Sequence, residues 1–136
     1  MSNQGSIYSG SCLCGAVRYQ AIGPLRNVVA CHCTQCRKTT GHYLAATNVS
    51  RDRLQLLSSK TLTWFRSSDS AERGFCAQCG ANLFWRRTHE GASTVSISAG
   101  TLDGPTGLKV VEHIFVADKG DYYDLPDNVP CKAGYE

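Results

Sequence analysis

Seven of the eight cysteines in this chain of 136 residues stand in three tight groups, a pattern typical of a metalloprotein. The groups are Cys12-Leu-Cys14, Cys31-His-Cys-Thr-Gln-Cys36 and Cys76-Ala-Gln-Cys79. A structural zinc site takes four protein ligands, whereas a catalytic site often keeps three and leaves one position open. The first and third groups together offer four thiols and the middle group offers three. The cysteines therefore predict one closed site and one open site.

The first and third groups can share one zinc ion. In a CxxC turn such as Cys76–Cys79 both sulfurs can converge on a single ion, and Gly80 permits the left-handed backbone that this turn needs. On a strand, Cys12 and Cys14 would face the same side. We therefore expect a structural zinc that joins the N-terminal hairpin to the middle of the chain and contributes folding free energy directly.

The middle group, Cys31, Cys33 and Cys36, predicts a different kind of site. Three thiolates over-neutralise Zn²⁺, so the ion activates water poorly and a hydrolase is disfavoured. An incoming thiol is a soft ligand that suits the open position better, and a thiol held as thiolate is a nucleophile at neutral pH. The three cysteines thus indicate a thiol substrate or cofactor.

A fourth protein ligand would close this second site and make it purely structural. The candidates are Cys131, His32, His42 and His113. His32 is the weakest, because on a strand it would point away from the two cysteines that flank it. Cys131 is expected to be a free thiol in a polar, loosely held tail that follows Pro126. A disulfide is disfavoured by the reducing cytosol.

Short runs rich in Val, Tyr, Phe, Trp and Thr, separated by Gly, Pro, Ser and Asp, predict a mainly β domain. One or two helical turns are expected near Thr34–Thr40. The expected strands cover Ala16–Ala21, Val28–Cys33, Tyr43–Val49, Thr61–Arg66, Asn82–Arg86, Thr94–Ala99 and His113–Val116. Four aromatic residues of these runs are expected in the core rather than in a binding site: Trp64, Phe65, Phe84 and Trp85.

Composition and charge narrow the range of partners. The net charge of +3 comes without a basic stripe, so no nucleic-acid partner is expected. The pairs Arg37-Lys38 and Arg86-Arg87 could still meet the carboxylates of a small acidic ligand. The first residues lack the pattern of a signal peptide, so none is expected, and no apolar run approaches the ~20 residues of a membrane span. We expect a cytoplasmic protein with a small-molecule thiol or carbonyl substrate and no membrane contact.

With these residues in place, the chain resembles the glutathione-dependent formaldehyde-activating enzyme family, which includes the centromere-protein-V-like proteins. The three cysteine groups in this order make the resemblance specific, and it covers about residues 8–126 of a single zinc-binding domain expected over residues 1–136. The matching stretches are Gly10-Ser-Cys-Leu-Cys-Gly15, Cys31-His-Cys-Thr-Gln-Cys-Arg-Lys38 with Gly41, Phe75-Cys-Ala-Gln-Cys-Gly80, Ala99-Gly-Thr-Leu-Asp103 and His113-Ile-Phe-Val116.

The resemblance implies an Mss4-like fold, in which small coiled antiparallel β-sheets surround two zinc sites. It implies a structural zinc at the first and third groups, and a second, catalytic zinc at Cys31, Cys33 and Cys36, where glutathione acts as the thiol co-substrate. The implied activity is that of a carbon–sulfur lyase, which adds glutathione reversibly to formaldehyde to give S-hydroxymethylglutathione. A related small carbonyl compound could replace formaldehyde. The alternative is a zinc-binding or glutathione-binding module without catalysis.

Overall fold

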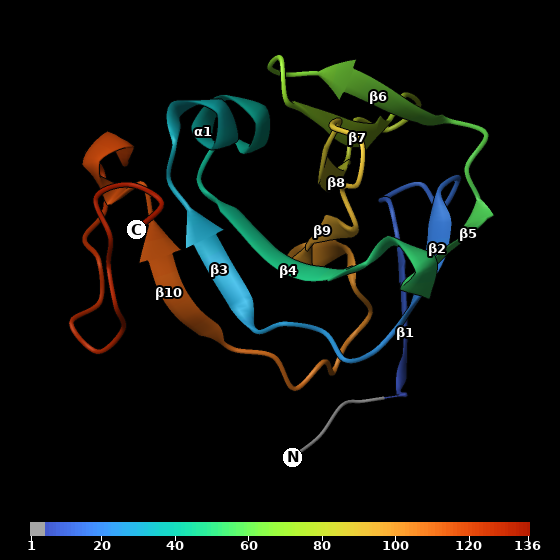
Figure 1. Cartoon of the computed structure of the whole chain (residues 1–136), viewed down its shortest axis with the longest axis horizontal. Coiled ribbons are helices and arrows are strands. Elements are labelled where there is room, and N and C mark those ends of the chain that lie inside the picture. The colour runs from blue at the N-terminus through green and yellow to red at the C-terminus, as the bar shows by residue number, and fades with distance from the viewer. Residues whose placement is uncertain (1–4) are drawn as a thin grey trace.

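The structure, a computed structural model, describes residues 5–136 as ten strands in two sheets with one α-helix (Figure 1). The helix is α1 (Thr34–Thr40), and three 3₁₀ turns are η1 (Arg51–Arg53), η2 (Ala99–Thr101) and η3 (Val116–Asp118). The strands are β1 (Ile7–Ser11), β2 (Arg18–Ile22), β3 (Val28–Cys31), β4 (Leu44–Ser50), β5 (Leu54–Ser58), β6 (Leu62–Arg66), β7 (Ala71–Cys76), β8 (Asn82–Arg87), β9 (Thr94–Ser98) and β10 (Val110–Ile114).

The strands form a small and a large sheet. The small sheet has the order β1-β2-β5, and the large sheet has the order β10-β3-β4-β9-β8-β7-β6. All neighbouring strands run antiparallel except β3 and β10, which are parallel. The mainly β prediction is therefore confirmed, with one parallel pair that the sequence did not indicate. No helix among residues 5–136 is long and apolar enough to cross a membrane.

The main core gathers side chains from both sheets. Alternate residues of β2 and β9 are buried, as expected when one face of a strand packs and the other meets solvent. Tyr19 of β2 and Phe84 of β8 lie inside this core with their ring centroids 5.3 Å apart in an edge-on contact. Cys12 and Cys76 belong to the same buried cluster, so the four-cysteine group lies against the main core.

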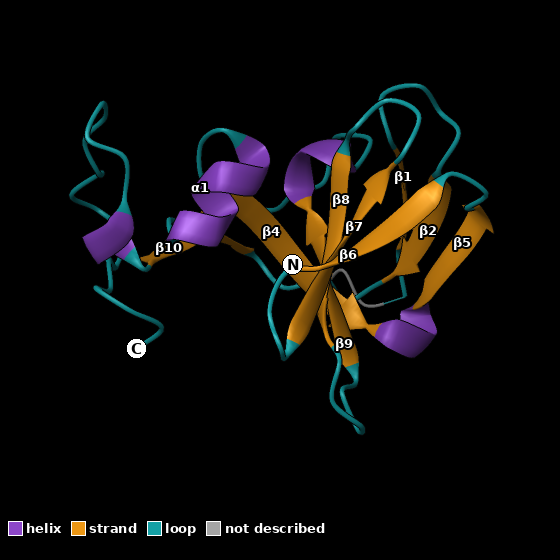
Figure 2. Cartoon of the chain, turned by 90° about the horizontal axis from the view of Figure 1, so that it is seen from above, coloured by secondary structure: helices purple, strands orange, loops and turns teal. Residues whose placement is uncertain are grey.

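A second, smaller cluster lies under α1. Figure 1 shows β3 and β10 on the side of the molecule away from the small sheet, and Figures 1 and 2 both show α1 beside β4. Cys36 of α1 packs on Leu44 and Ala46 of β4, and Cys31 and Cys33 adjoin this contact. The middle cysteine group therefore lies where a strand end, a short helix and the neighbouring strand meet.

The C-terminal tail is held more firmly than the sequence suggested. The His113 amide donates to the Pro130 carbonyl at 2.9 Å, and the Lys132 amide donates to the His113 carbonyl at 2.9 Å. The Phe115 amide donates to the carbonyl of Gly134 at 3.0 Å. Because the tail is hydrogen-bonded to His113 of β10 and to Phe115 just beyond that strand, the expectation of a loosely held tail is wrong.

Two cysteine clusters and the cavity beside one of them

The four-cysteine cluster brings together residues more than sixty positions apart. Its four sulfurs lie within 4.8 Å of one another. The Cys14 sulfur is 3.7 Å from that of Cys12 and 3.8 Å from that of Cys76. Four sulfurs arranged tetrahedrally around zinc at ~2.3 Å would be about 3.8 Å apart, so these spacings fit a zinc ion.

The local backbone of this cluster differs in one respect from the expectation. Cys12 and Cys14 lie in the turn that follows β1 rather than on a strand, so their sulfurs converge through a turn. Gly15 and Gly80, which follow the two cysteine pairs, both have φ of 80°. The left-handed backbone predicted at Gly80 is thus present, and Gly15 after the first cysteine pair has the same conformation.

Donors already surround the sulfurs of this cluster. The Val17 amide donates to Cys12 Sγ at 3.3 Å, and the Cys79 amide donates to Cys76 Sγ at 3.4 Å. Gln78 Nε2 donates to Cys14 Sγ at 3.3 Å. Such hydrogen bonds favour the thiolate over the thiol, and zinc binds the thiolate. Both the spacing and the donors therefore suit a structural zinc.

The sulfurs of Cys31, Cys33 and Cys36, called the trio below, also lie within 4.8 Å of one another. Cys31 is the last residue of β3, Cys33 is the N-cap of α1, and Cys36 lies in the first turn of that helix. The Cys33 sulfur accepts a hydrogen bond from the Cys36 amide at 3.3 Å. A strand end followed directly by a helix start thus delivers three sulfurs from six residues to one place.

Protons are divided unevenly among the trio. Hydrogen bonds from Cys31 and Cys36 lower the pKa of Cys33 to about 2, whereas the hydrogen bond to Cys33 is the main cause that raises the pKa of Cys31. Three thiolates this close repel one another, so a cation is needed before all three can be deprotonated together. The donor set therefore suits a soft divalent cation such as zinc.

Each of the four candidate fourth ligands has another partner. His32 is fully buried on the far side of β3, where its Nδ1 bonds the Tyr123 hydroxyl and its Nε2 lies 2.8 Å from His113 Nδ1. Burial, with the nearby His113 as a second cause, lowers the pKa of His32 to about 4. The prediction that His32 points away from the cysteines is confirmed.

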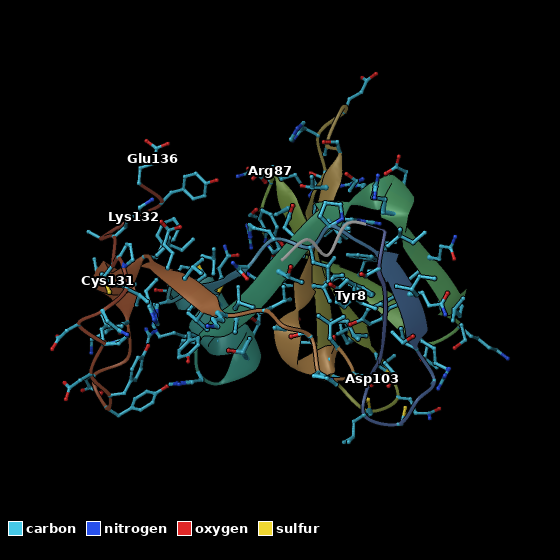
Figure 3. The ribbon with its side chains drawn as sticks, turned by 90° about the horizontal axis from the view of Figure 1, so that it is seen from below. Tyr8, Arg87, Asp103, Cys131, Lys132 and Glu136 are labelled. Atoms are coloured by element: carbon cyan, nitrogen blue, oxygen red, sulfur yellow. The ribbon has the colours of Figure 1, made fainter. Side chains whose placement is uncertain are left out.

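The other two candidates lie on the same far side or in the tail. His42 Nδ1 is 2.6 Å from the Tyr122 hydroxyl. The Cys131 thiol is exposed and lies 3.5 Å from the Val129 carbonyl, in the tail at the left edge of Figure 3, where it is labelled next to Lys132. Among the described residues, the group able to hold an ion at this place comprises the trio alone.

A cavity of about 760 Å³ opens beside the trio, and all three cysteines line it. The four-cysteine cluster lines neither this cavity nor a second one of about 200 Å³. The apolar part of the wall comes from β3, β4, β8, the end of β10 and the residue that follows it, and it includes Leu44, Trp85, Ile114 and Phe115. Phe115 has the left-handed φ of 55°, which is uncommon for a bulky residue and is held here by pairing with the tail.

The polar part of the cavity wall carries positive charge. No Asp or Glu among the described residues lines the cavity, whereas Arg26 and Arg87 both do. Arg26 is held in place by a 3.0 Å hydrogen bond from its Nη2 to the Ala46 carbonyl. Other polar residues of the wall are Gln35, Asn48, Thr94, Ser96 and Tyr135. The cavity therefore suits an anionic ligand.

The two basic pairs, Arg37-Lys38 and Arg86-Arg87, contribute only one residue to the cavity wall. Arg87 lines the cavity, but its neighbour Arg86 pairs with Glu72 at 2.7 Å and lies over the Trp64 ring. Arg37 and Lys38 lie on α1 and do not line the cavity. Only one of the four basic residues is thus placed to meet a ligand there.

Of the four aromatic residues predicted for the core, two lie in it or against it and two do not. Phe84 is buried and Trp64 packs against the main core, as expected. Phe65 is 58% exposed, and Trp85 lines the cavity. These two expectations were wrong, because β6 is the edge strand of the large sheet and β8 faces the cavity with one of its sides.

Comparison with known proteins agrees with these features. Residues 7–118 match the sequence profile of a family described as glutathione-dependent formaldehyde-activating enzyme. A Schizosaccharomyces pombe protein named as an uncharacterized lyase is 29% identical over 87% of this chain and 85% of its own length. A Halomonas elongata protein named "Putative glutathione-dependent formaldehyde-activating enzyme" is 30% identical over 95% of this chain and 88% of its own length.

A solved structure shows the same fold. The crystal structure of a Rhodobacter sphaeroides protein superposes with a TM-score of 0.58 at 22% identity, over 73% of this chain and 91% of that one. Together with the two sheets and the two cysteine clusters, this similarity confirms the predicted Mss4-like fold class. The profile match and the 30% identical relative together show that the chain belongs to the glutathione-dependent formaldehyde-activating enzyme family.

Proposed function

We propose that the trio and its cavity bind glutathione beside a zinc ion and promote the reversible addition of its thiol to formaldehyde or a related small carbonyl compound. One observation carries the proposal: the three-cysteine cluster opens into a cavity of about 760 Å³, whereas the four-cysteine cluster does not line it. That volume lies within the about 300–1,000 Å³ typical of small-molecule sites. The family and the names of its members support the choice of substrates.

The two metal sites have separate tasks in this proposal. Cys12, Cys14, Cys76 and Cys79 would hold a structural zinc, because their sulfurs have the spacing and the hydrogen-bond donors that suit it. Cys31, Cys33 and Cys36 would hold the second zinc. When bound there, zinc supplies positive charge that favours the thiolate form of a thiol at neutral pH.

The residues of the cavity wall position glutathione. Its two carboxylates are the groups that Arg26 and Arg87 would recognise, since guanidinium groups bind carboxylates through charge-assisted hydrogen bonds. Trp85 and Phe115 line the cavity, and their rings would limit the access of water to the reacting sulfur. Because glutathione adds to formaldehyde without any catalyst, the protein needs to supply only positioning and a supply of thiolate.

The chemical step is a simple addition. The glutathione sulfur gives up its proton to water and forms a bond to the carbonyl carbon. The electron pair of the carbonyl π bond moves to oxygen, which takes a proton from water to complete S-hydroxymethylglutathione. No oxidant or reductant is needed, and the reverse reaction passes through the same steps.

The test compares Cys33→Ser with Cys131→Ser, which removes a thiol outside both clusters. Adduct formation from formaldehyde and glutathione is followed by NMR exchange measurements, with the uncatalysed rate subtracted. We expect wild type and Cys131→Ser to accelerate the reaction and Cys33→Ser to give only the uncatalysed rate. Unchanged acceleration by Cys33→Ser would exclude the trio as the site. Glutathione binding without acceleration by the wild type would identify a binding module instead.

A further inference from the structure

Arg73 of β7 is a buried charge without a carboxylate partner. The residue is only 4% exposed, and its Nε and Nη1 atoms have no hydrogen-bond partner in the structure. Among residues 5–136, the recorded ion pairs join Arg86 to Glu72 and Lys132 to Glu112, and neither includes Arg73. Burying an unpaired charge is strongly unfavourable, so a compensating negative group is needed nearby.

The side chain of Arg73 points to the trio. Its Nη2 atom lies 3.7 Å from the sulfur of Cys36 and 3.5 Å from Oε1 of Gln35. Cys36 is itself buried at 4% exposure, so little water separates the guanidinium from the sulfur. The trio is therefore the negative group that this arginine faces.

We propose that Arg73 is a positioning residue that neutralises the trio when zinc is bound and so strengthens zinc binding there. The inference rests on the second zinc of the proposed function. Three thiolates and one Zn²⁺ leave a single negative charge, and one guanidinium cancels it. Arg73 also donates to Cys36, which fixes the sulfur in the direction of the other two.

The four-cysteine cluster shows the contrast. Four thiolates with Zn²⁺ leave two negative charges. Cys12 and Cys76 are buried there, but Cys14 is exposed and the sulfurs receive backbone, amide and hydroxyl donors. That cluster can disperse its charge into water and into these donors. In the trio, the buried Cys36 lies in the first turn of α1, and there the fixed cation Arg73 faces its sulfur.

The experiment measures zinc retention at each cluster during titration with a competing chelator. Alkylation followed by mass spectrometry identifies which cysteines become reactive as zinc leaves. Arg73→Met keeps the apolar bulk and removes the charge, and Arg73→Lys keeps the charge. Arg86→Met is the control, because it removes a guanidinium from the adjacent strand β8 that is already paired with Glu72.

We expect Arg73→Met to weaken zinc binding at the trio by about 10- to 100-fold, the effect typical of losing a partner of a metal ligand. The four-cysteine cluster should keep its zinc, Arg86→Met should behave as wild type, and Arg73→Lys should regain part of the affinity. If Arg73→Met does not fold, Arg73→Gln replaces it under the same expectations.

Wild-type retention at the trio in the folded, charge-free variant would overturn the role of Arg73 and leave the proposed function intact. A wild-type protein that binds two zinc ions but does not accelerate adduct formation would overturn the proposed reaction and leave the role of Arg73 intact. A wild-type protein that binds zinc only at the four-cysteine cluster would overturn both.

Discussion

The Nε2 atom of His32 lies 2.8 Å from Nδ1 of His113, on the side of β3 opposite to the cysteines that flank His32 in the sequence. The alternation of side chains along an extended segment thus separates one histidine from two thiols within three residues. His32 holds Tyr123, in the segment that leads to the tail, while the cysteines face the cavity. The histidine therefore contributes to packing, whereas the two cysteines beside it in the sequence belong to the candidate site.

Replacing His32 should affect stability and leave zinc in place. Because His32 is fully buried and bonded through both ring nitrogens, His32→Ala should lower the free energy of unfolding by about 2–3 kcal/mol. Thermal unfolding measures this loss, and elemental analysis of the folded protein should still find two zinc ions per chain. Loss of one ion would indicate that His32 is a ligand after all.

Arg87 and Arg86 form a matched pair for testing glutathione recognition. Arg87→Gln should raise the KM for glutathione about three- to tenfold with kcat nearly unchanged, because a partly solvated carboxylate contact contributes about 1 kcal/mol to binding. Arg86→Gln should leave the KM unchanged, since Arg86 pairs with Glu72. Steady-state kinetics with varied glutathione measures both. Equal effects from the two variants would argue against a carboxylate contact at Arg87.

Zinc at the four-cysteine cluster should contribute directly to folding. Cys76 is fully buried in the main core and joins the turn after β1 to the turn after β7. We expect Cys76→Ser to lower the melting temperature by on the order of 10 °C and to bind one zinc fewer. Cys131→Ser should match wild type in both measurements. A Cys76→Ser protein that melts like wild type would show that the cluster carries no folding energy.

Gly10 should tolerate no side chain. A Cβ at this position would lie 2.7 Å from the Thr101 carbonyl oxygen and even closer to the Tyr19 hydroxyl, so Gly10→Ala must displace backbone or core. The expected cost is about 1–3 kcal/mol. Gly100→Ala is the control, because its Cβ would have no atom within 4 Å. Chemical denaturation compares the two, and equal midpoints would contradict the close packing at Gly10.

The cysteine clusters could be predicted from the sequence because short loops limit where their sulfurs can go. Three thiols within six residues can meet with almost any turn, which explains why the trio assembles as expected although Cys33 caps a helix instead of continuing a strand. The same holds for Cys12 and Cys14, which meet in a turn and not on a strand. Spacing determined which sulfurs meet within each group, whereas the first and third groups were joined because a structural zinc takes four protein ligands.

Strands and charged contacts were harder to predict. All seven expected strands overlap observed ones, but β1, β5 and β7 were not expected. Strand β5 is rich in Leu and lacks β-branched residues, and β7 contains Gly74 among charged residues. The burial of Arg73 has no local signal either, since arginine is almost never buried unless paired, and its partner lies 37 positions away. The burial of Arg73 beside Cys36 becomes visible only once the fold brings β7 next to α1.

During synthesis the three cysteines of the trio emerge well before most of the cavity wall. The trio is complete as soon as residue 36 has been made, whereas the cavity wall includes Trp85, Phe115 and Tyr135. A nascent chain can therefore offer three thiols to a metal long before it can enclose a substrate. Until the last residues dock beside β10, these thiols are open to oxidation, against which a bound metal such as the proposed zinc would protect them.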